Sequence, residues 1–361
     1  MAEQVNSMRV TRAAKKRAAT AMGSVQVLHP QATKKRVILG ELTNLKNVVA
    51  ISESDLVGPQ KPKTRLRKKE EKIVEIEANS DDPQMCAPYA SDIFEYLHSM
   101  EVEKKRRPLP DYMEKIQKDV TANMRGILVD WLVQVTEQYK LVSDTLYLTV
   151  SYLDRFLSSN CLHRHKLQLL GVSCMLIASK YEETTPPHIE DFCYITDHSC
   201  TKVDIIKMES EILNSLKFEM GNPTINTFLR RFTMAAQENS KSPNLEMDFL
   251  GCYLAELSLL DYACIRFLPS MVAASVIFLA KFTIQPKIHP WNSTLQRCSG
   301  YKPSDLKDCV LAIHEFKLYR KSNAGSWLAV RDKYKQDKFK RVALLTPTIE
   351  IPMAYFEDVE V

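Results

Sequence analysis

The stretch MRGILVDWLVQVTEQYK, residues 124–140, decides the fold. Its centre is apolar almost all round, at Ile127, Leu128, Val129, Trp131, Leu132, Val133 and Val135. A helix that is hydrophobic on every side is a buried one, because other elements must cover it. The stretch therefore predicts a central helix in an all-α bundle.

Helical patterns continue on both sides of this stretch. Residues 92–100 form a short helical pattern that RRPLPDY breaks. After the central helix, further patterns lie at 145–159, 166–183, 188–196 and 202–218. We expect Asp144 to cap the N-terminus of the first of these. Small residues in the second, such as Gly171, should let neighbouring backbones come close.

The pattern breaks at Gly221-Asn222-Pro223 and then restarts. Five more helical patterns follow, at 225–238, 245–262, 267–282, 291–298 and 305–321. Their order and lengths echo the first five, and SCMLIASK and SVIFLAK stand third in each set. We predict two tandem five-helix bundles, at 86–220 with the preceding helix and at 221–345. One irregular ten-helix domain is the alternative. The end of the chain, with a tail at 346–361, is expected to pack as an extended strap.

Charge separates the N-terminal part of the chain from the rest. The net charge of +5 divides into +10 for residues 1–70 and −5 for residues 71–361. Residues 1–70 hold no aromatic residue and no sustained apolar period. Such a segment cannot bury enough apolar surface to offset its ordering entropy. We predict a disordered basic tail over residues 1–85.

Glycine and cysteine usage excludes several classes of site. The nine glycines are too far apart for either common phosphate-binding glycine loop. None of the nine cysteines forms a C-x-x-C pair, so a zinc ribbon has no support and we expect no metal or cofactor. The apolar runs are too short to span a bilayer. These features favour a soluble intracellular protein with reduced thiols and no membrane contact.

Four blocks carry a family resemblance: MRGILVDWLVQV, YLDRFLSS, LIASKYEE and the stretch from YITD to KMESEIL. In this order and spacing the chain resembles an A-type cyclin, most closely the plant kind, from about Pro88 through all ten helices. The resemblance implies two cyclin-type bundles and no catalytic residue. It also implies a regulatory subunit that activates a cyclin-dependent Ser/Thr kinase, docks its substrates and controls cell-cycle progression.

Lys180 and Glu209 are charged residues on otherwise apolar helical patterns, where a charge is seldom left unpaired. The resemblance implies that both grip the PSTAIRE-like regulatory helix of the kinase. The apolar surface around them would come from Tyr181, Leu176, Phe218, Met220 and Ile93. The alternative is a Lys–Glu bridge that only ties the bundle together.

A second candidate site lies on the central helix itself. Met124, Ile127, Leu128 and Trp131 have the spacing of one helical face, which by itself indicates core. The resemblance implies instead an exposed groove that receives Arg-x-Leu segments of substrates and inhibitors, bordered by Arg164, Leu167 and Gln168. Gln134 stands where animal relatives usually carry an acid, so contact with the basic residue of the docking segment should be weaker.

The tail contains RVILGELTN, residues 36–44, which matches a destruction box, R-x-x-L-x-x-x-x-N. The resemblance implies that a ubiquitin ligase captures Arg36, Leu39, Gly40 and Asn44. The alternative is an apolar patch without function.

Basic clusters at 12–17, 34–36 and 63–69 indicate nuclear import rather than nucleic-acid binding, because no aromatics interleave with them. We expect a nuclear protein, with a cytoplasmic pool as an option. Two rival functions remain: a cyclin-fold scaffold in transcription without kinase activation, and a helical enzyme. The second would need a convergent polar pocket, for which the sequence offers no candidate set.

Overall fold

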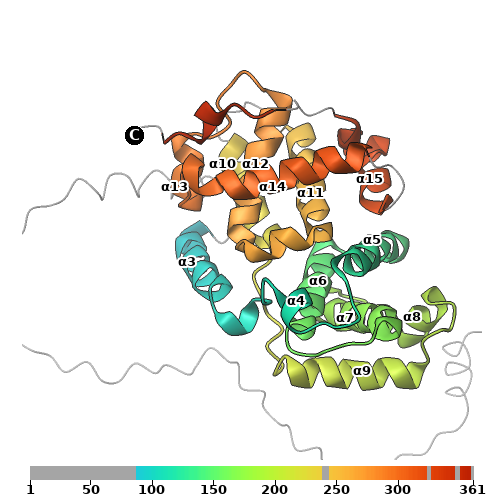
Figure 1. Ribbon diagram of the computed structural model, residues 1–361. Helices are drawn as coiled ribbons and strands as arrows, with labels where there is room; N and C mark the ends of the chain where they lie inside the picture. Colours follow the sequence, from blue (N-terminus) through green and yellow to red (C-terminus); the bar gives the residue numbers. More distant parts are fainter. Residues whose placement is uncertain (1–86, 238–243, 323–326, 346–349, 359–361) are drawn as a thin grey trace, which may run out of the picture. The chain divides into compact units, whose positions relative to one another are not determined.

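The structure is a computed structural model that describes residues 87–237, 244–322, 327–345 and 350–358. These residues lie within one compact unit, Thr64–Val361. In the described ranges every regular element is an α-helix or a 3₁₀-helix, which confirms the all-α prediction (Figure 1). The predicted tail, residues 1–85, lies outside them.

The first bundle contains the five helices expected from the sequence. Two further helices, α3 (Ala90–Glu101) and α4 (Tyr112–Lys115), precede it. The five are α5 (Ala122–Tyr139), α6 (Ser143–Leu157), α7 (Leu167–Glu182), α8 (Ile189–Ile195) and α9 (Lys202–Ser215). Short 3₁₀ turns lie at Ala87–Tyr89, Lys104–Arg106 and Arg164–Lys166.

The central helices of this bundle pack closely. Thr121 caps α5 by accepting a hydrogen bond from the backbone N–H of Met124, so the helix begins at a fixed residue. Val129, Leu132 and Val133 of α5 are fully buried. A Cβ on Gly171 of α7 would stand 2.9 Å from the Leu128 side chain. The small residue therefore lets α7 approach α5, as the sequence predicts.

Asp144 does not cap α6, contrary to the sequence-based expectation. Val142 occupies the N-cap position, and no side chain caps the helix there. Asp144 lies in the first turn, where it accepts hydrogen bonds from Asn226 and Arg230 of the second bundle. Its carboxylate joins the two bundles and is engaged away from the helix end.

The second bundle repeats the order of the first. It consists of α10 (Ile225–Gln237), α11 (Leu245–Leu260), α12 (Pro269–Ile284), α13 (Ser293–Ser299) and α14 (Pro303–Ser322). The helix α12, third like α7, is buried over most of its length and packs against α10, α11 and α14. Smaller elements are α15 (Ala329–Tyr334) and 3₁₀ turns at Tyr262–Arg266, Asp337–Phe339, Val342–Leu344 and Met353–Phe356.

Polar contacts join the two bundles along α5. The guanidinium of Arg125 is 1% exposed, forms a two-pronged ion pair with Asp154 and donates to the backbone oxygen of Leu259 at 2.8 Å. A Cβ on Gly126 would stand 2.6 Å from the ring of Trp327. Only glycine leaves room for this ring.

The helix α15 is anchored by a buried ion pair. The Lys333 ammonium lies 2.8 Å from a carboxylate oxygen of Glu256 on α11 and 3.3 Å from Glu137 on α5. Tyr334 donates a second hydrogen bond to Glu256 at 2.8 Å. One short helix thus contacts both bundles.

The described part of the C-terminal segment packs on the second bundle, but it is not simply extended. Val342, Ile351 and Phe356 are buried, and the last of these stacks on Phe278 with ring centroids 5.3 Å apart. Two stretches of this segment wind into 3₁₀ turns. The expectation of an extended strap was therefore wrong in its conformation.

Candidate partner-binding faces

Lys180 and Glu209 meet on the surface of the first bundle, where α7 packs against α9. The Lys180 Nζ lies 2.6 Å from Glu209 Oε1, and the two side chains are 46% and 15% exposed. A capping box at the start of α9, between Thr201 and Asp204, fixes where that helix begins and so which way Glu209 points. Both predicted residues are thus brought together, and an incoming chain can reach them.

Several of the apolar side chains predicted for this surface are exposed to solvent. Phe218 is 66% exposed, Tyr181 55% and Ile93 41%, and Met220 is half-buried. The prediction that Leu176 belongs to this surface was wrong, because its side chain is 1% exposed and supports α7 from inside the bundle. The remaining residues form an exposed apolar surface of the kind that marks a protein-binding site.

A pocket of about 510 Å³ opens beside this surface. Its walls come from α3, the end of α7 and the loop after α9, and they include Tyr96, Tyr181, Phe218 and Met220. Tyr96 is 61% exposed, and the sequence-based assignment missed it. Its spacing of three from Ile93, on the same helical face, was the signal that could have found it.

Ile206 on α9 is a second residue that the sequence-based assignment missed. It is 46% exposed and stands one turn before Glu209 on the same side of the helix. We name the set Ile93, Tyr96, Lys180, Tyr181, Ile206, Glu209, Phe218 and Met220 the α7–α9 face.

The second candidate site follows the exposed side of α5. Ile127 is 50% exposed, Met124 and Trp131 are half-buried, and Gln134 is exposed. Leu128 is 6% exposed and lies against Gly171, so it forms the floor under this surface rather than part of it. The central helix is therefore not covered on every side, and its apolar stripe continues onto the surface.

The border predicted for this groove is partly exposed. Arg164 and Gln168 are exposed, whereas Leu167 is 6% exposed and packs inward. The Arg164 guanidinium lies 2.6 Å from Asp119. Hydrogen bonds from the backbone and side chain of Arg164 lower the pKa of the Asp119 carboxyl. We name Met124, Ile127, Trp131, Gln134, Arg164 and Gln168 the α5 groove, after the groove that the family resemblance implies.

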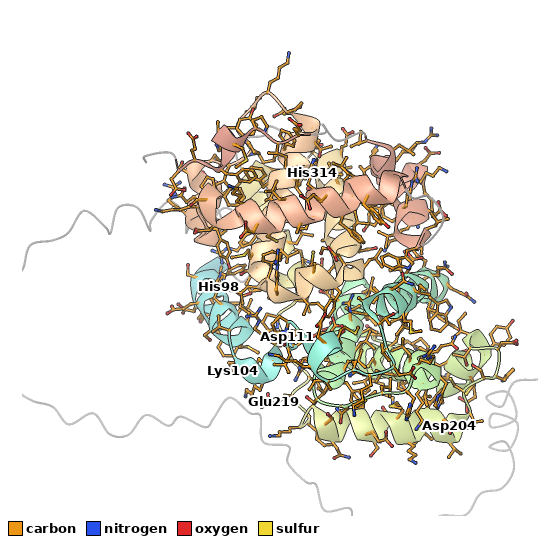
Figure 2. All side chains as sticks on the ribbon, viewed as in Figure 1. His98, Lys104, Asp111, Asp204, Glu219 and His314 are labelled. Atoms are coloured by element: carbon orange, nitrogen blue, oxygen red, sulfur yellow. The ribbon has the colours of Figure 1, made fainter. Side chains whose placement is uncertain are left out.

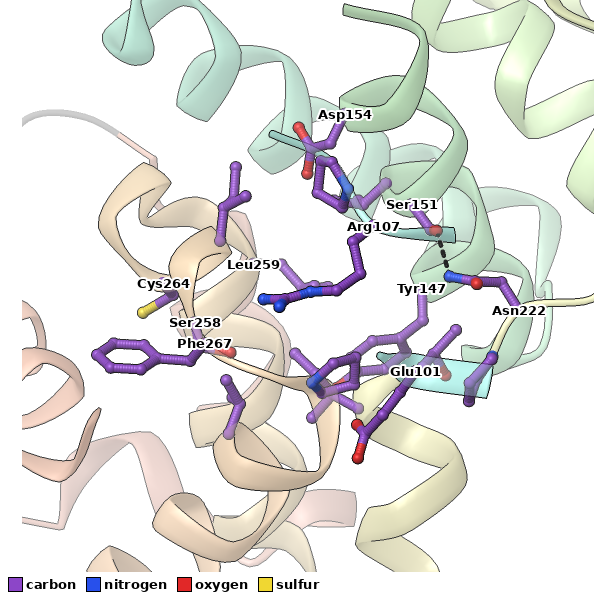
Figure 3. Close-up of a pocket in the computed structure, with 18 of the residues that line it drawn as sticks. Glu101, Arg107, Tyr147, Ser151, Asp154, Asn222, Ser258, Leu259, Cys264 and Phe267 are labelled. Carbon is purple, nitrogen blue, oxygen red and sulfur yellow. Dashed lines mark hydrogen bonds between the residues drawn. The ribbon is translucent and has the colours of Figure 1, made fainter. Parts of the chain in front are cut away.

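A second cavity, of about 110 Å³, lies between the two bundles (Figure 3). Tyr147, Ser151 and Asn222 line one side, Leu259 and Phe267 line the other, and Asn222 donates to the Ser151 hydroxyl at 3.0 Å (Figure 3). Its charged groups are engaged: Asp154 with Arg125, and Arg107 with the Arg266 backbone oxygen at 3.0 Å. This lining offers no nucleophile–base pair.

The described residues lack two other kinds of feature. Within them no group of three or more His, Cys, Asp or Glu is placed to hold a metal ion. Nor does any helix in the described ranges have the length and apolarity needed to cross a membrane.

Two adjoining family models match this arrangement of two helical bundles. The N-terminal domain model of cyclins matches residues 92–221, and the C-terminal domain model matches residues 223–348. The chain belongs to the cyclin family, whose members are regulatory subunits and not enzymes.

Its relatives are plant A3-type cyclins. The chain is 55% identical to putative cyclin-A3-1 of Arabidopsis thaliana over 99% of both chains, and 52% identical to cyclin-A3-2 of the same plant over the full length of both. It is 54% identical to cyclin-A3-1 of Oryza sativa subsp. japonica over 97% of this chain and 96% of that one. These matches confirm the resemblance to plant A-type cyclins.

A solved structure, a viral cyclin from herpesvirus saimiri, has the same fold. Its TM-score is 0.54 at 22% identity, over 62% of this chain and 96% of that one. The fold prediction of two tandem cyclin bundles is confirmed. The destruction box, Arg36 to Asn44, and the basic clusters lie outside the described residues and stay predictions.

Proposed function

We propose that this cyclin binds and activates a cyclin-dependent Ser/Thr kinase through the α7–α9 face. The observation that carries the proposal is the Lys180–Glu209 pair, held at the surface of a bundle on which Tyr181, Ile206 and Phe218 are also exposed. A bridge that served only the bundle would not explain why Tyr181, the residue after Lys180, and Phe218 are exposed to solvent. The regulatory helix of a kinase with a PSTAIRE-like sequence supplies both an apolar face and polar groups at its end.

Activation follows from differential binding and needs no chemistry in this chain. A surface that binds the active position of the kinase helix more tightly than the inactive one shifts the kinase toward activity. That position completes the Lys–Glu pair that phosphoryl transfer requires, and it frees the activation segment. The charged pair supplies orientation, and the apolar rim supplies most of the buried area.

The test is kinase binding by two single variants and a matched control. Lys180→Ala and Glu209→Ala should each weaken binding by about 2–5 kcal/mol, because each leaves a charge unpaired in the interface. Lys115→Ala is the control, since its ammonium also lies 2.6 Å from a carboxylate, that of Asp111, and it stands on α4 outside the face. Titration calorimetry with a purified kinase measures the three. Wild-type affinity in Lys180→Ala would remove the assignment.

We further propose that the α5 groove docks Arg-x-Leu segments of substrates and inhibitors. Ile127, Met124 and Trp131 provide an apolar surface of suitable size for a leucine. Gln134 is exposed at its edge and carries no charge to attract the arginine.

Peptide titration at low salt tests this groove. Gln134→Glu should tighten binding of an Arg-x-Leu peptide, because an exposed carboxylate attracts the arginine when screening is weak. The gain should shrink when salt is added. An affinity that does not change with Gln134→Glu, or that changes equally for a peptide without the arginine, would count against the groove.

The tail carries two further proposals, both supported by sequence alone. Arg36, Leu39, Gly40 and Asn44 act as a destruction box read by a ubiquitin ligase. A protein with Arg36→Ala and Leu39→Ala should then stay at a stable level through mitosis while the parent disappears. Equal decay of both would contradict the proposal.

The second proposal from the tail concerns location. The basic clusters at 12–17, 34–36 and 63–69 direct the protein to the nucleus. Replacing the lysines and arginines of one cluster by alanine, in turn, should identify the cluster whose loss leaves the protein cytoplasmic. Nuclear accumulation of a protein that lacks all three would refute it.

A further inference from the structure

In the loop after α9, residues 216–222, the backbone adopts a conformation that residues other than glycine disfavour. Lys217 and Phe218 both have positive φ, at 53° and 57°. In this left-handed region a Cβ crowds the following carbonyl oxygen, so helix ends of this kind usually use glycine. Neither residue is glycine, and the conformation is therefore strained.

The strain places an aromatic ring in solvent. Phe218 is 66% exposed. Burial of its ring therefore does little to offset the free-energy cost of the unfavourable backbone conformation. Strained residues persist only where the surrounding structure holds them, and they gather at binding and switch sites. Among the described residues none buries the Phe218 ring, so a partner that covers it would gain from the way this loop presents it.

Donors from two other elements hold the loop by its carbonyl oxygens. From α6, Tyr152 donates its hydroxyl to Met220 at 3.0 Å and Arg155 donates to Glu219 at 3.0 Å. Arg106, in the turn after α3, donates to the Gly221 oxygen. A Cβ on Gly221 would stand 2.9 Å from the Tyr181 hydroxyl, so this end of the loop is close-packed as well.

The carboxylate of Glu219 ties the loop to the turn after α3 (Figure 2). Lys105 and Arg106 lie 2.9 Å and 3.0 Å from its oxygens. The hydrogen bond from Lys105 and the nearby cations lower the pKa of Glu219. The loop is thus fixed from its carbonyl oxygens and from its one acidic side chain.

Arg155 is a buried charged residue, which a purely structural role does not readily explain. It is 4% exposed, burial lowers its pKa, and its Nε is buried without a hydrogen-bond partner. A buried guanidinium normally has a carboxylate beside it. In the described part of the chain its guanidinium donates to the backbone of the loop that carries Phe218, and the Glu219 carboxylate acts on it only through longer-range attraction.

We propose that Tyr152 and Arg155 are positioning residues that hold loop 216–222 in the strained conformation that presents Phe218 to the partner. The proposal rests on the proposed kinase binding, and it adds two buried α6 residues that do not touch the partner. The loop is preorganised, so the partner does not bear the cost of ordering it. Losing either donor should lower affinity chiefly through Phe218, and Met220 is the other residue of the face that this loop carries.

A double-mutant cycle tests this route. Tyr152→Phe keeps the ring and removes only the hydrogen bond to the loop. Kinase affinity should fall about fivefold, the effect of one lost hydrogen bond, and by less than about twofold when Phe218 is already alanine. A merely structural role would give the same loss in both backgrounds and would overturn the proposal. Arg155→Gln should behave alike if it folds.

The matched control is Tyr139→Phe. Its hydroxyl also donates to a backbone oxygen, that of Asp191 at 2.9 Å, but away from the loop. It should lower stability about as much as Tyr152→Phe and leave affinity unchanged. A loss of affinity equal to that of Tyr152→Phe would contradict the proposal.

Hydrogen exchange separates failure of this proposal from failure of the proposed function. The amides of Phe218 and Glu219 donate to the Leu213 and Leu216 oxygens at 3.0 Å. Without any kinase present, Tyr152→Phe should speed exchange in a peptide spanning 213–222, and Tyr139→Phe should not. Unchanged exchange would refute the loop mechanism even if the kinase binds. Faster exchange with no kinase binding would leave the loop mechanism standing and refute the proposed function.

Discussion

Replacing Asp154 by alanine should be among the most damaging single substitutions in the first bundle. Its carboxylate accepts hydrogen bonds from Arg125 Nε and Nη2, each at 2.7 Å, and from the Tyr112 hydroxyl at 2.9 Å. The side chains of Arg125 and Asp154 are 1% and 6% exposed. Asp154→Ala leaves a guanidinium buried without its counter-charge, while that guanidinium still links α5 to Leu259 of the second bundle.

The size of the loss follows from this burial. Breaking a buried ion pair by removing one partner costs about 3–5 kcal/mol, and a whole domain is stable by only about 5–15 kcal/mol. In urea, a loss of this size moves the unfolding midpoint by more than about 1 M. Replacing both charged residues by apolar ones, Arg125→Met with Asp154→Leu, leaves no charge unpaired. The double variant should therefore lose less free energy of unfolding than the two single variants together.

Urea unfolding followed by circular dichroism measures these values at neutral pH. The exposed Lys115–Asp111 pair is the control, and Lys115→Ala should leave the midpoint where it was. If Asp154→Ala shifts the urea midpoint no more than Lys115→Ala does, the Arg125–Asp154 pair does not stabilise the contact between the bundles.

Three further predictions concern the α3 anchor, the thiols and the loop carboxylate. Glu101→Ala removes a buried carboxylate that holds α3 to the first turn of α12. This variant should lower the free energy of unfolding by about 1.5–3 kcal/mol and weaken kinase binding. An unaltered urea midpoint would contradict this. Burial raises the pKa of the Cys252 thiol to about 11. At about pH 8 the exposed Cys161 should therefore react with iodoacetamide first, and Cys252 only after unfolding. Early modification of Cys252, seen by mass spectrometry, would contradict this. The pKa of Glu219 lies below its ordinary 4.5, chiefly because of the hydrogen bond from Lys105. The contribution of this carboxylate to stability is therefore present above pH 4.5 and is lost as pH falls through the lowered pKa. Lys105→Ala should raise the titration midpoint of the Glu219 carboxyl in NMR, and an unmoved midpoint would refute the pairing.

Helical periodicity was enough to predict the ten helices of the two bundles. The apolar patterns are long, and breaks such as Gly221-Asn222-Pro223 separate them clearly. Periodicity shows which face of a helix is apolar, but not how deep each residue lies. Leu128 is buried because α5 and α7 pack closely at Gly171, and Leu176 is 1% exposed although Lys180, one turn later on the same helix, is at the surface.

Contacts between distant segments were beyond the reach of the sequence pattern. Asp144 has the sequence position of an N-cap, but Arg230, 86 residues later, takes its carboxylate. The left-handed backbone at Lys217 and Phe218 is similarly hidden, because no glycine marks it. Such features depend on donors such as Arg155 that reach the loop only in the folded chain.

The most direct test of the central claim is a reconstitution of the full chain with a purified kinase that has a PSTAIRE-like helix. Complex formation and phosphorylation of a Ser-Pro peptide are measured together, for the wild type, Lys180→Ala and the Lys115→Ala control. We expect a stable complex and strong activation by the wild type and the control, with activation by Lys180→Ala restored only at much higher concentration. A wild-type chain that leaves the kinase unbound and inactive at every concentration would contradict it.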